Sequence, residues 1–154
     1  MPSEYMMYLS ILLVGALAIG GISVTMIAIN NTMDDRATET NLENILQNIA
    51  EVIHNLKVYG ENQIEQGAID INEYVMLSLP ASIHNEEYLI EVTSTNITYS
   101  LKASLVEKTE VSVSVSLLIS PDMILISGTI ESTSSAPRIG FIYNGVTSSI
   151  VLED

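Results

Sequence analysis

Residues 5–29 read YMMYLSILLVGALAIGGISVTMIAI, and Glu4 is the one charged residue before Asp34. A helix of residues 5–33 would be roughly 40 Å long at about 1.5 Å per residue, whereas the hydrocarbon core of a bilayer is about 30 Å thick. Small residues recur along the segment, and in an apolar helix they let neighbouring helices approach closely. The segment is therefore predicted to be a helix that either spans a membrane or packs inside a protein assembly.

The charges of the chain lie almost entirely after this segment. Of the 154 residues, 19 are acidic and 5 are basic, and residues 34–154 carry 18 of the acidic and all 5 basic side chains, a net of −13. Self-repulsion keeps such a domain soluble and argues against binding to nucleic acid or to an anionic membrane surface. Since the chain has no cysteine, it has no disulfide framework and no thiolate metal site. We expect two parts, an apolar segment and one small acidic domain.

The four residues before the apolar segment, MPSE, include no lysine or arginine. The apolar run is also longer than the apolar region of a secretory signal peptide. Two interpretations fit: a basic leader has been removed from a mature chain, or the chain starts at Met1. We favour the first, because a membrane segment needs flanking charge to orient it.

A second helical pattern follows residues 30–35, a polar stretch that is either a break or a frayed turn. An amphipathic helix is predicted over residues 39–58, with Gly60 as its stop, because apolar residues recur there at spacings of three and four. Without a break, one rod of roughly 80 Å would run to Tyr59. The apolar stripe predicted to pack against the rest of the domain is Leu42, Ile45, Leu46, Ile49, Val52, Ile53 and Leu56.

Short alternating segments after Gly60 predict strands, and Asn144-Gly145 is the strongest hairpin signal between two of them. The predicted fold is α+β. A long N-terminal α-helix, with an apolar half and an amphipathic half (residues 1–59), is followed by a small all-β, sandwich-like domain of two sheets (residues 60–154). The predicted strands are residues 74–79, 88–93, 97–105, 111–119, 123–130, 139–143 and 147–152.

Residues that usually carry catalysis or bind metal ions are few and poorly spaced. His54 and His84 have no metal-ligand spacing to one another, and the acidic pairs at 34–35 and 86–87 lack the glycine and spacing of an EF-hand loop. The sequence has no G-x-S-x-G elbow and no glycine-rich phosphate loop. We therefore expect no enzyme, with no catalytic residue, metal site or cofactor.

Two stretches match the N-glycosylation pattern, Asn30-Asn31-Thr32 and Asn96-Ile97-Thr98. Asn96 is the candidate site for a glycan because it falls in a predicted turn, Ser94-Thr95-Asn96, between two strands. Asn30 lies at the end of the apolar helix, where a glycan would collide with packed neighbours.

The order of these elements resembles that of the archaeal type IV pilins and their relatives. The shared features are an apolar N-terminal helix without a retained leader, an amphipathic continuation, and an acidic β domain rich in serine and threonine. In many type IV pilins an acidic residue is fifth in the mature chain, and the nearest match here is Glu4. The resemblance implies a prepilin peptidase that removes the leader, an assembly machinery, a filament core of bundled apolar helices, and an outer β domain that is often glycosylated.

The expected function is that of a structural subunit of an extracellular filament at the cell surface, for adhesion or surface attachment. The subunit would be a membrane-inserted precursor that becomes part of a homo-polymer by exchanging lipid for the helices of identical subunits. The alternative is a single-pass membrane-anchored β-sandwich component of a surface machine, such as the stator of the archaeal motility filament. The residues expected in the filament core are Leu12, Leu13, Gly15, Leu17, Ile19, Gly20, Gly21, Ile22, Met26 and Ile27.

Overall fold

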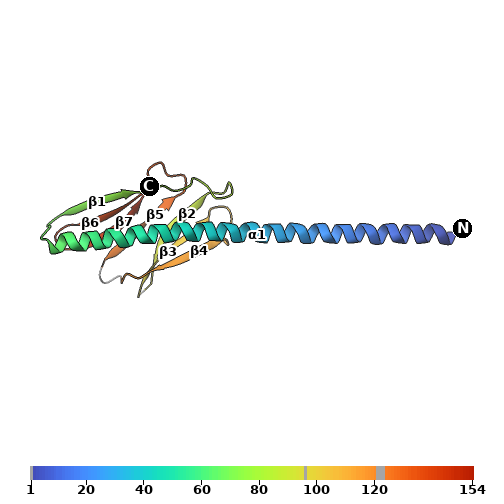
Figure 1. Cartoon of the computed structure of the whole chain (residues 1–154), viewed down its shortest axis with the longest axis horizontal. Helices are drawn as coiled ribbons and strands as arrows, with labels where there is room; N and C mark the ends of the chain where they lie inside the picture. The colour runs from blue at the N-terminus through green and yellow to red at the C-terminus, as the bar shows by residue number, and fades with distance from the viewer. Residues whose placement is uncertain (1, 96, 121–123) are drawn as a thin grey trace. The chain divides into compact units, whose positions relative to one another are not determined.

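The computed structural model describes the backbone of residues 2–95, 97–120 and 124–154, and within these ranges it describes side chains from residue 12 onward, apart from residue 15. The chain forms two compact units, Met1–Ala37 and Thr38–Asp154. One helix, α1 (Pro2–Glu65), contributes residues to both units and is followed by strands (Figure 1). The predicted α+β fold with a long N-terminal helix is confirmed.

Helix α1 has no break at the polar stretch, because its helical backbone continues through residues 30–35. The predicted end near Tyr59 is wrong, and Gly60 lies inside the helix, where it is buried. The helix ends instead before Gly67, whose φ of 91° is available to glycine at little cost. There the Gly67 N–H donates to the Ile64 carbonyl (2.9 Å) and the Ala68 N–H donates to the Gln63 carbonyl (3.0 Å). These two bonds form a Schellman cap.

The strands of the described residues form a single seven-stranded sheet in the order β1-β6-β7-β5-β2-β3-β4. Strands β5 and β7 pair in parallel, and all the other neighbouring pairs are antiparallel. Each predicted strand segment overlaps one observed strand, and the largest difference is at β1, which begins three residues before the predicted start at Tyr74. The strands are β1 (Ile71–Met76), β2 (Tyr88–Ser94), β3 (Tyr99–Leu105), β4 (Ser112–Leu117), β5 (Leu125–Glu131), β6 (Arg138–Tyr143) and β7 (Ser148–Glu153).

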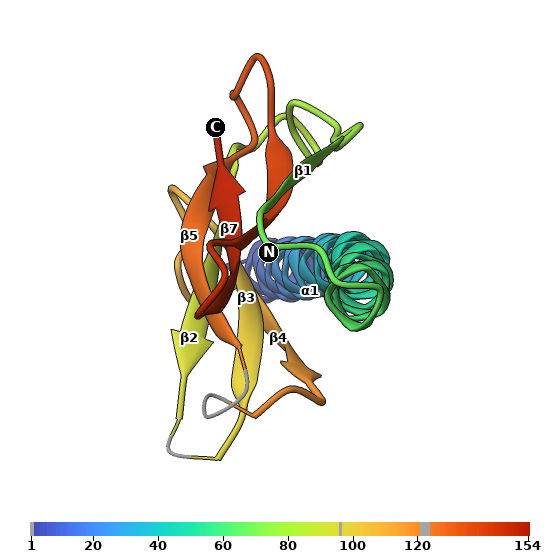
Figure 2. The same cartoon turned by 90° about the vertical axis from the view of Figure 1, so that its left-hand side faces the viewer.

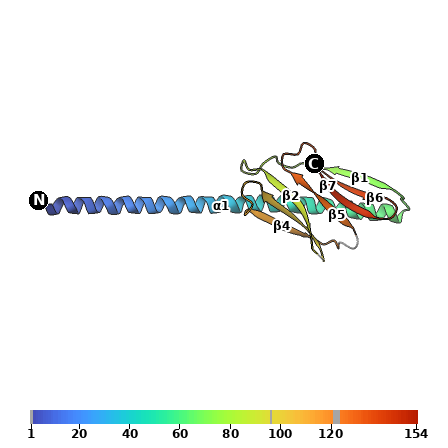
Figure 3. The same cartoon turned by 180° about the vertical axis from the view of Figure 1, so that it is seen from behind.

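The arrangement differs in one respect from the predicted pair of sheets. All the described strands lie in one sheet, and the part of α1 in the second unit covers one face of it (Figure 2). Seen from behind, the strands lie in front of this part of the helix, and no described helix covers their outer face (Figure 3). The alternating pattern of each strand identifies the buried side chains but not whether a sheet or a helix covers them.

The core of the second unit lies between α1 and this sheet. In β3 every second residue is buried, namely Tyr99, Leu101, Ala103 and Leu105, so one face of the strand packs inward and the other is half-exposed. The helix supplies five buried side chains to the same cluster. They are Leu42, Leu46, Ile49, Ile53 and Leu56.

The predicted Asn144-Gly145 hairpin is confirmed. Strands β6 and β7 pair up to Tyr143 opposite Ser148, and Gly145 takes a positive φ of 84° in the loop between them. The Asn144 Oδ1 atom accepts hydrogen bonds from the backbone N–H groups of Val146 (3.1 Å) and Thr147 (2.9 Å). The asparagine thereby closes the turn with its own side chain.

Candidate functional site

The most unusual surface of the described chain is the apolar segment of α1. Between Leu12 and Ile29, its large apolar side chains are 58% to 72% exposed. Soluble monomers rarely expose a continuous apolar surface of this extent, which usually marks contact with protein or membrane. This part of α1 is also long and apolar enough to cross a membrane. The exposed predicted core residues are Leu12, Leu13, Leu17, Ile19, Ile22, Met26 and Ile27.

In the part of this segment whose side chains are described, the hydroxyl groups are hydrogen-bonded to the backbone of the helix itself. The Ser23 hydroxyl donates to the Ile19 carbonyl (2.9 Å), and the Thr32 hydroxyl donates to the Ala28 carbonyl (2.9 Å). The Thr25 hydroxyl contacts the carbonyls of Gly21 (3.1 Å) and Ile22 (2.9 Å). These hydroxyls therefore enter apolar surroundings without leaving an unpaired donor, which would otherwise cost about 1–3 kcal/mol each.

Small residues open one part of the segment to close approach. A Cβ atom placed on Gly20 or on Gly21 would have no neighbouring heavy atom within 4 Å. A partner helix is thus free to contact the backbone there, as in other apolar helix pairs. The third glycine of the predicted core, Gly15, lies outside the residues whose side-chain surroundings are described.

The predicted packing stripe lies in the second unit. Five of its residues are buried, as described above, and Ile45 and Val52 are half-buried against the same core. The stripe thus joins α1 to the sheet. This part of α1 is buried against its own unit, whereas the described large apolar side chains between Leu12 and Ile29 are exposed.

The two histidines have ordinary surroundings. His54 is exposed on α1, whereas His84 lies in a tight turn with Asn85, both at positive φ, and its Nδ1 atom is hydrogen-bonded to the Thr38 hydroxyl (2.8 Å). Next to this turn, Glu86 forms an ion pair with Lys108 (2.6 Å). In the described residues, no group of three or more histidine, aspartate or glutamate side chains is placed to hold a metal ion.

The glycosylation candidate Asn96 lies outside the described residues. The residues on either side of it belong to the connection between β2 and β3, whose pairing ends at Ser94 opposite Tyr99. Thr95 and Ile97 are exposed. The second match to the pattern, Asn30, lies on α1 and is exposed in the isolated chain.

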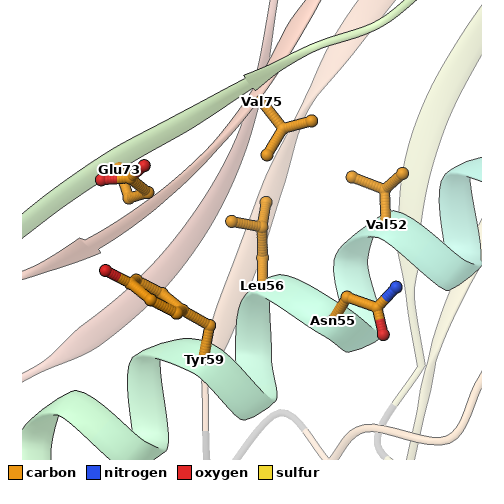
Figure 4. Close-up of a pocket in the computed structure, with 6 residues that line it drawn as sticks. All are labelled: Val52, Asn55, Leu56, Tyr59, Glu73 and Val75. Atoms are coloured by element: carbon orange, nitrogen blue, oxygen red, sulfur yellow. The ribbon is translucent and has the colours of Figure 1, made fainter.

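A groove that sequence reasoning did not single out follows one flank of α1 in the second unit. Three adjoining hollows of about 390, 290 and 360 Å³ share lining residues, with Val52 common to the first two and Ile45 to the last two. In the first hollow, Leu56 of α1 points toward Val75 of β1, and Tyr59 and Glu73 lie beside them (Figure 4). We call this surface, from Asn41 to Tyr59, the flank groove.

One rim of the flank groove is a stripe of exposed amides, and its floor is apolar. No described hydrogen bond involves the side chains of Asn41, Asn44, Asn48 or Asn55, which all line the groove. A signal for the stripe is present in the sequence, since these asparagines recur at helical spacings beside the apolar stripe. Asparagine is a poor helix former, so four of them on one flank of α1 suggest a role outside the helix itself.

Comparison with known proteins gives one family assignment. A family model matches residues 4–139, from just before the apolar segment into β6. The chain belongs to the DUF7266 family. This is a family of unknown function, and no curated protein and no solved structure matches the chain. The match therefore includes both the apolar segment and strands β1 to β5.

Proposed function

We propose that this chain is a structural subunit of an extracellular filament of the type IV pilus kind. Residues 5–29 would form the filament core together with the same segment of identical subunits, and the acidic β domain would face outward. Before assembly the segment would lie in the membrane. The filament would serve adhesion or surface attachment.

The observation that carries this proposal is the exposure of the large apolar side chains between Leu12 and Ile29. Removing one large apolar side chain from water lowers the free energy by about 1.5–3 kcal/mol. We therefore expect this surface to lie in lipid or against protein. Transfer from lipid to neighbouring helices exchanges one apolar environment for another, and close packing at Gly20 and Gly21 can decide the balance. The hydroxyls paired within the helix fit both environments.

The second candidate function is a single-pass anchor for a β domain in a surface machine, and the length and hydropathy of α1 are compatible with it. An anchor needs about 20 apolar residues and tolerates a flexible connection to its domain. Here α1 passes from the apolar segment into the helix of the β domain without a break. Nothing about anchoring requires the amphipathic stripe from Leu42 to Leu56 to follow the apolar segment directly, and this favours the filament.

The two functions predict different physical states of the protein in cells. A filament subunit is released by shearing as long polymers, visible by negative-stain microscopy, in which mass spectrometry identifies this chain as the main component. An anchored component stays with the membrane fraction and is released only by detergent. Recovery of the chain solely from detergent extracts would reject the filament.

A further inference from the structure

We propose that the flank groove is the surface on which a second copy of this chain lays its apolar segment, residues 5–29. The inference rests on the proposed function and deepens it. It names the part of the β domain that contacts the helix of a neighbouring subunit. Three observations on the groove and the segment support it.

The first observation is charge. Among the residues that line the three hollows, Glu73 is the one acidic side chain, although residues 34–154 carry a net of −13. Another β domain approaching the groove would bring its own excess of carboxylates, and like charges brought close together without screening repel. Residues 5–33 are the long stretch of a second copy that has no charge.

The second observation is length. The flank groove follows α1 from Asn41 to Tyr59, about 27 Å at 1.5 Å per residue, and the exposed segment from Leu12 to Ile29 is about 26 Å long on the same basis. One helix can therefore lie along the other over the whole groove. The open space at Gly20 and Gly21 allows the backbone to approach protruding side chains such as Met76.

The third observation is the chemistry of the lining. Half-buried Ile45, Val52 and Leu79 form an apolar floor for an apolar helix, and Met76 of β1 is 61% exposed at its edge. The asparagine rim is neutral, so an apolar helix that docks against this rim removes no charge from water there. The exposed amides stay hydrated, or they meet the amides of Asn30 and Asn31 at the end of the incoming segment.

The absence of cysteine makes the contact directly testable by disulfide mapping. Chains with Met76→Cys are co-assembled with chains that carry one cysteine in the apolar segment, and the filaments are oxidised mildly. A disulfide needs Cα atoms about 4–7 Å apart, so each mixed dimer reports one contact between two subunits. The matched control for Met76 is Leu125→Cys, 60% exposed on the face of β5 opposite to the buried Ile126. The segment cysteines replace Leu13, Leu17 and Val24 on one side of the helix, and Ile19, Ile22 and Met26 on the other.

We expect mixed dimers between Met76→Cys and one of these two sets, because a helix lying in a groove presents one side to it. The Leu125→Cys chain should form no such dimers. Filaments of normal appearance in which Met76→Cys forms a disulfide with neither set would reject the groove contact. The proposed function would then remain intact. If the unmodified chain forms no filaments at all, the proposed function fails and the groove contact fails with it.

A charge substitution gives an independent readout. Met76→Asp places a carboxylate at the edge of the groove and should abolish or shorten filaments, whereas Leu125→Asp should leave them unchanged. Circular dichroism of both variants verifies that the β domain folds. A folded Met76→Asp chain that assembles as well as the Leu125→Asp chain would contradict the proposal.

Discussion

Gly60 of α1 lies directly against the aromatic ring of Phe141 in β6, so closely that a Cβ atom on Gly60 would overlap the ring. Phe141 is fully buried, and Gly60 is buried on α1, one turn before the half-buried Ile64. The glycine thus serves as a packing position that lets a bulky strand residue reach the helix backbone.

Replacing Gly60 with alanine should therefore destabilise the second unit. Alanine is the better helix former by about 1 kcal/mol, but forcing a methyl group into a filled core costs about 1–3 kcal/mol. We expect a net loss of stability in urea unfolding followed by circular dichroism. Gly21→Ala is the control, because its Cβ would meet no neighbour. A Gly60→Ala chain more stable than the unmodified one would show that the contact with Phe141 relaxes freely.

The buried side chain of Tyr88 should make the free energy of unfolding depend on pH in the alkaline range. Its side chain is 1% exposed, its hydroxyl donates to the Pro80 carbonyl (2.7 Å), and burial raises its pKa from 10.0 to about 12. Because the folded pKa lies above the unfolded one, the contribution of the neutral phenol is complete below pH 10. It is lost as pH rises from 10 through 12, by about 2–3 kcal/mol in total.

The variant Tyr88→Phe should lack this part of the alkaline loss. At pH 7 it should be less stable by about 1 kcal/mol, because the Pro80 carbonyl loses its donor. Urea unfolding of both chains at pH 7, 10 and 11.5 gives the difference. Equal alkaline losses in the two chains would mean that ionisation of Tyr88 is not opposed by its surroundings.

A carboxylate in the apolar segment should prevent assembly. Leu13→Asp would place a charge among packed helices, where the penalty is several kcal/mol even after relaxation. Leu118→Asp, at a side chain that is 97% exposed after β4, is the matched control and should assemble normally. The assembly of each variant is measured by the yield of filaments after shearing. Normal filaments from Leu13→Asp would remove residue 13 from the core.

Filaments should tolerate salt. The outer domains carry an excess of negative charge and repel one another, and this repulsion is screened over about 8 Å at physiological ionic strength but over about 30 Å at 0.01 M. Sedimentation at increasing salt should therefore find the polymer intact. Disassembly on adding salt, with reassembly on its removal, would mean that ion pairs hold the subunits together.

The sequence patterns predicted most of the elements of this fold. The stripe from Leu42 to Leu56 and the alternation in each strand depend on spacing within one element, and Asn144-Gly145 carries its own turn chemistry. The end of α1 was mispredicted, because local propensity cannot distinguish Gly60, which accommodates Phe141 81 residues later, from Gly67, which caps the helix.

These sequence patterns could not predict which strands pair when the strands are distant in the sequence. The parallel contact of β5 with β7, such as Ile126 opposite Ile150, skips β6, and nothing in the alternation of either strand specifies its neighbour. The flank groove was missed for the same reason. Its floor joins α1 to β1 and to the segment after β1, so its existence depends on tertiary packing.

The most direct test of the central proposal is a cryo-electron microscopy map of polymers sheared from cells that produce this chain. The account predicts a core of closely packed helices formed by residues 5–29 of successive subunits, surrounded by the acidic β domains. Polymers held together by their β domains, with the apolar segment absent from the core or embedded singly in lipid, would contradict it.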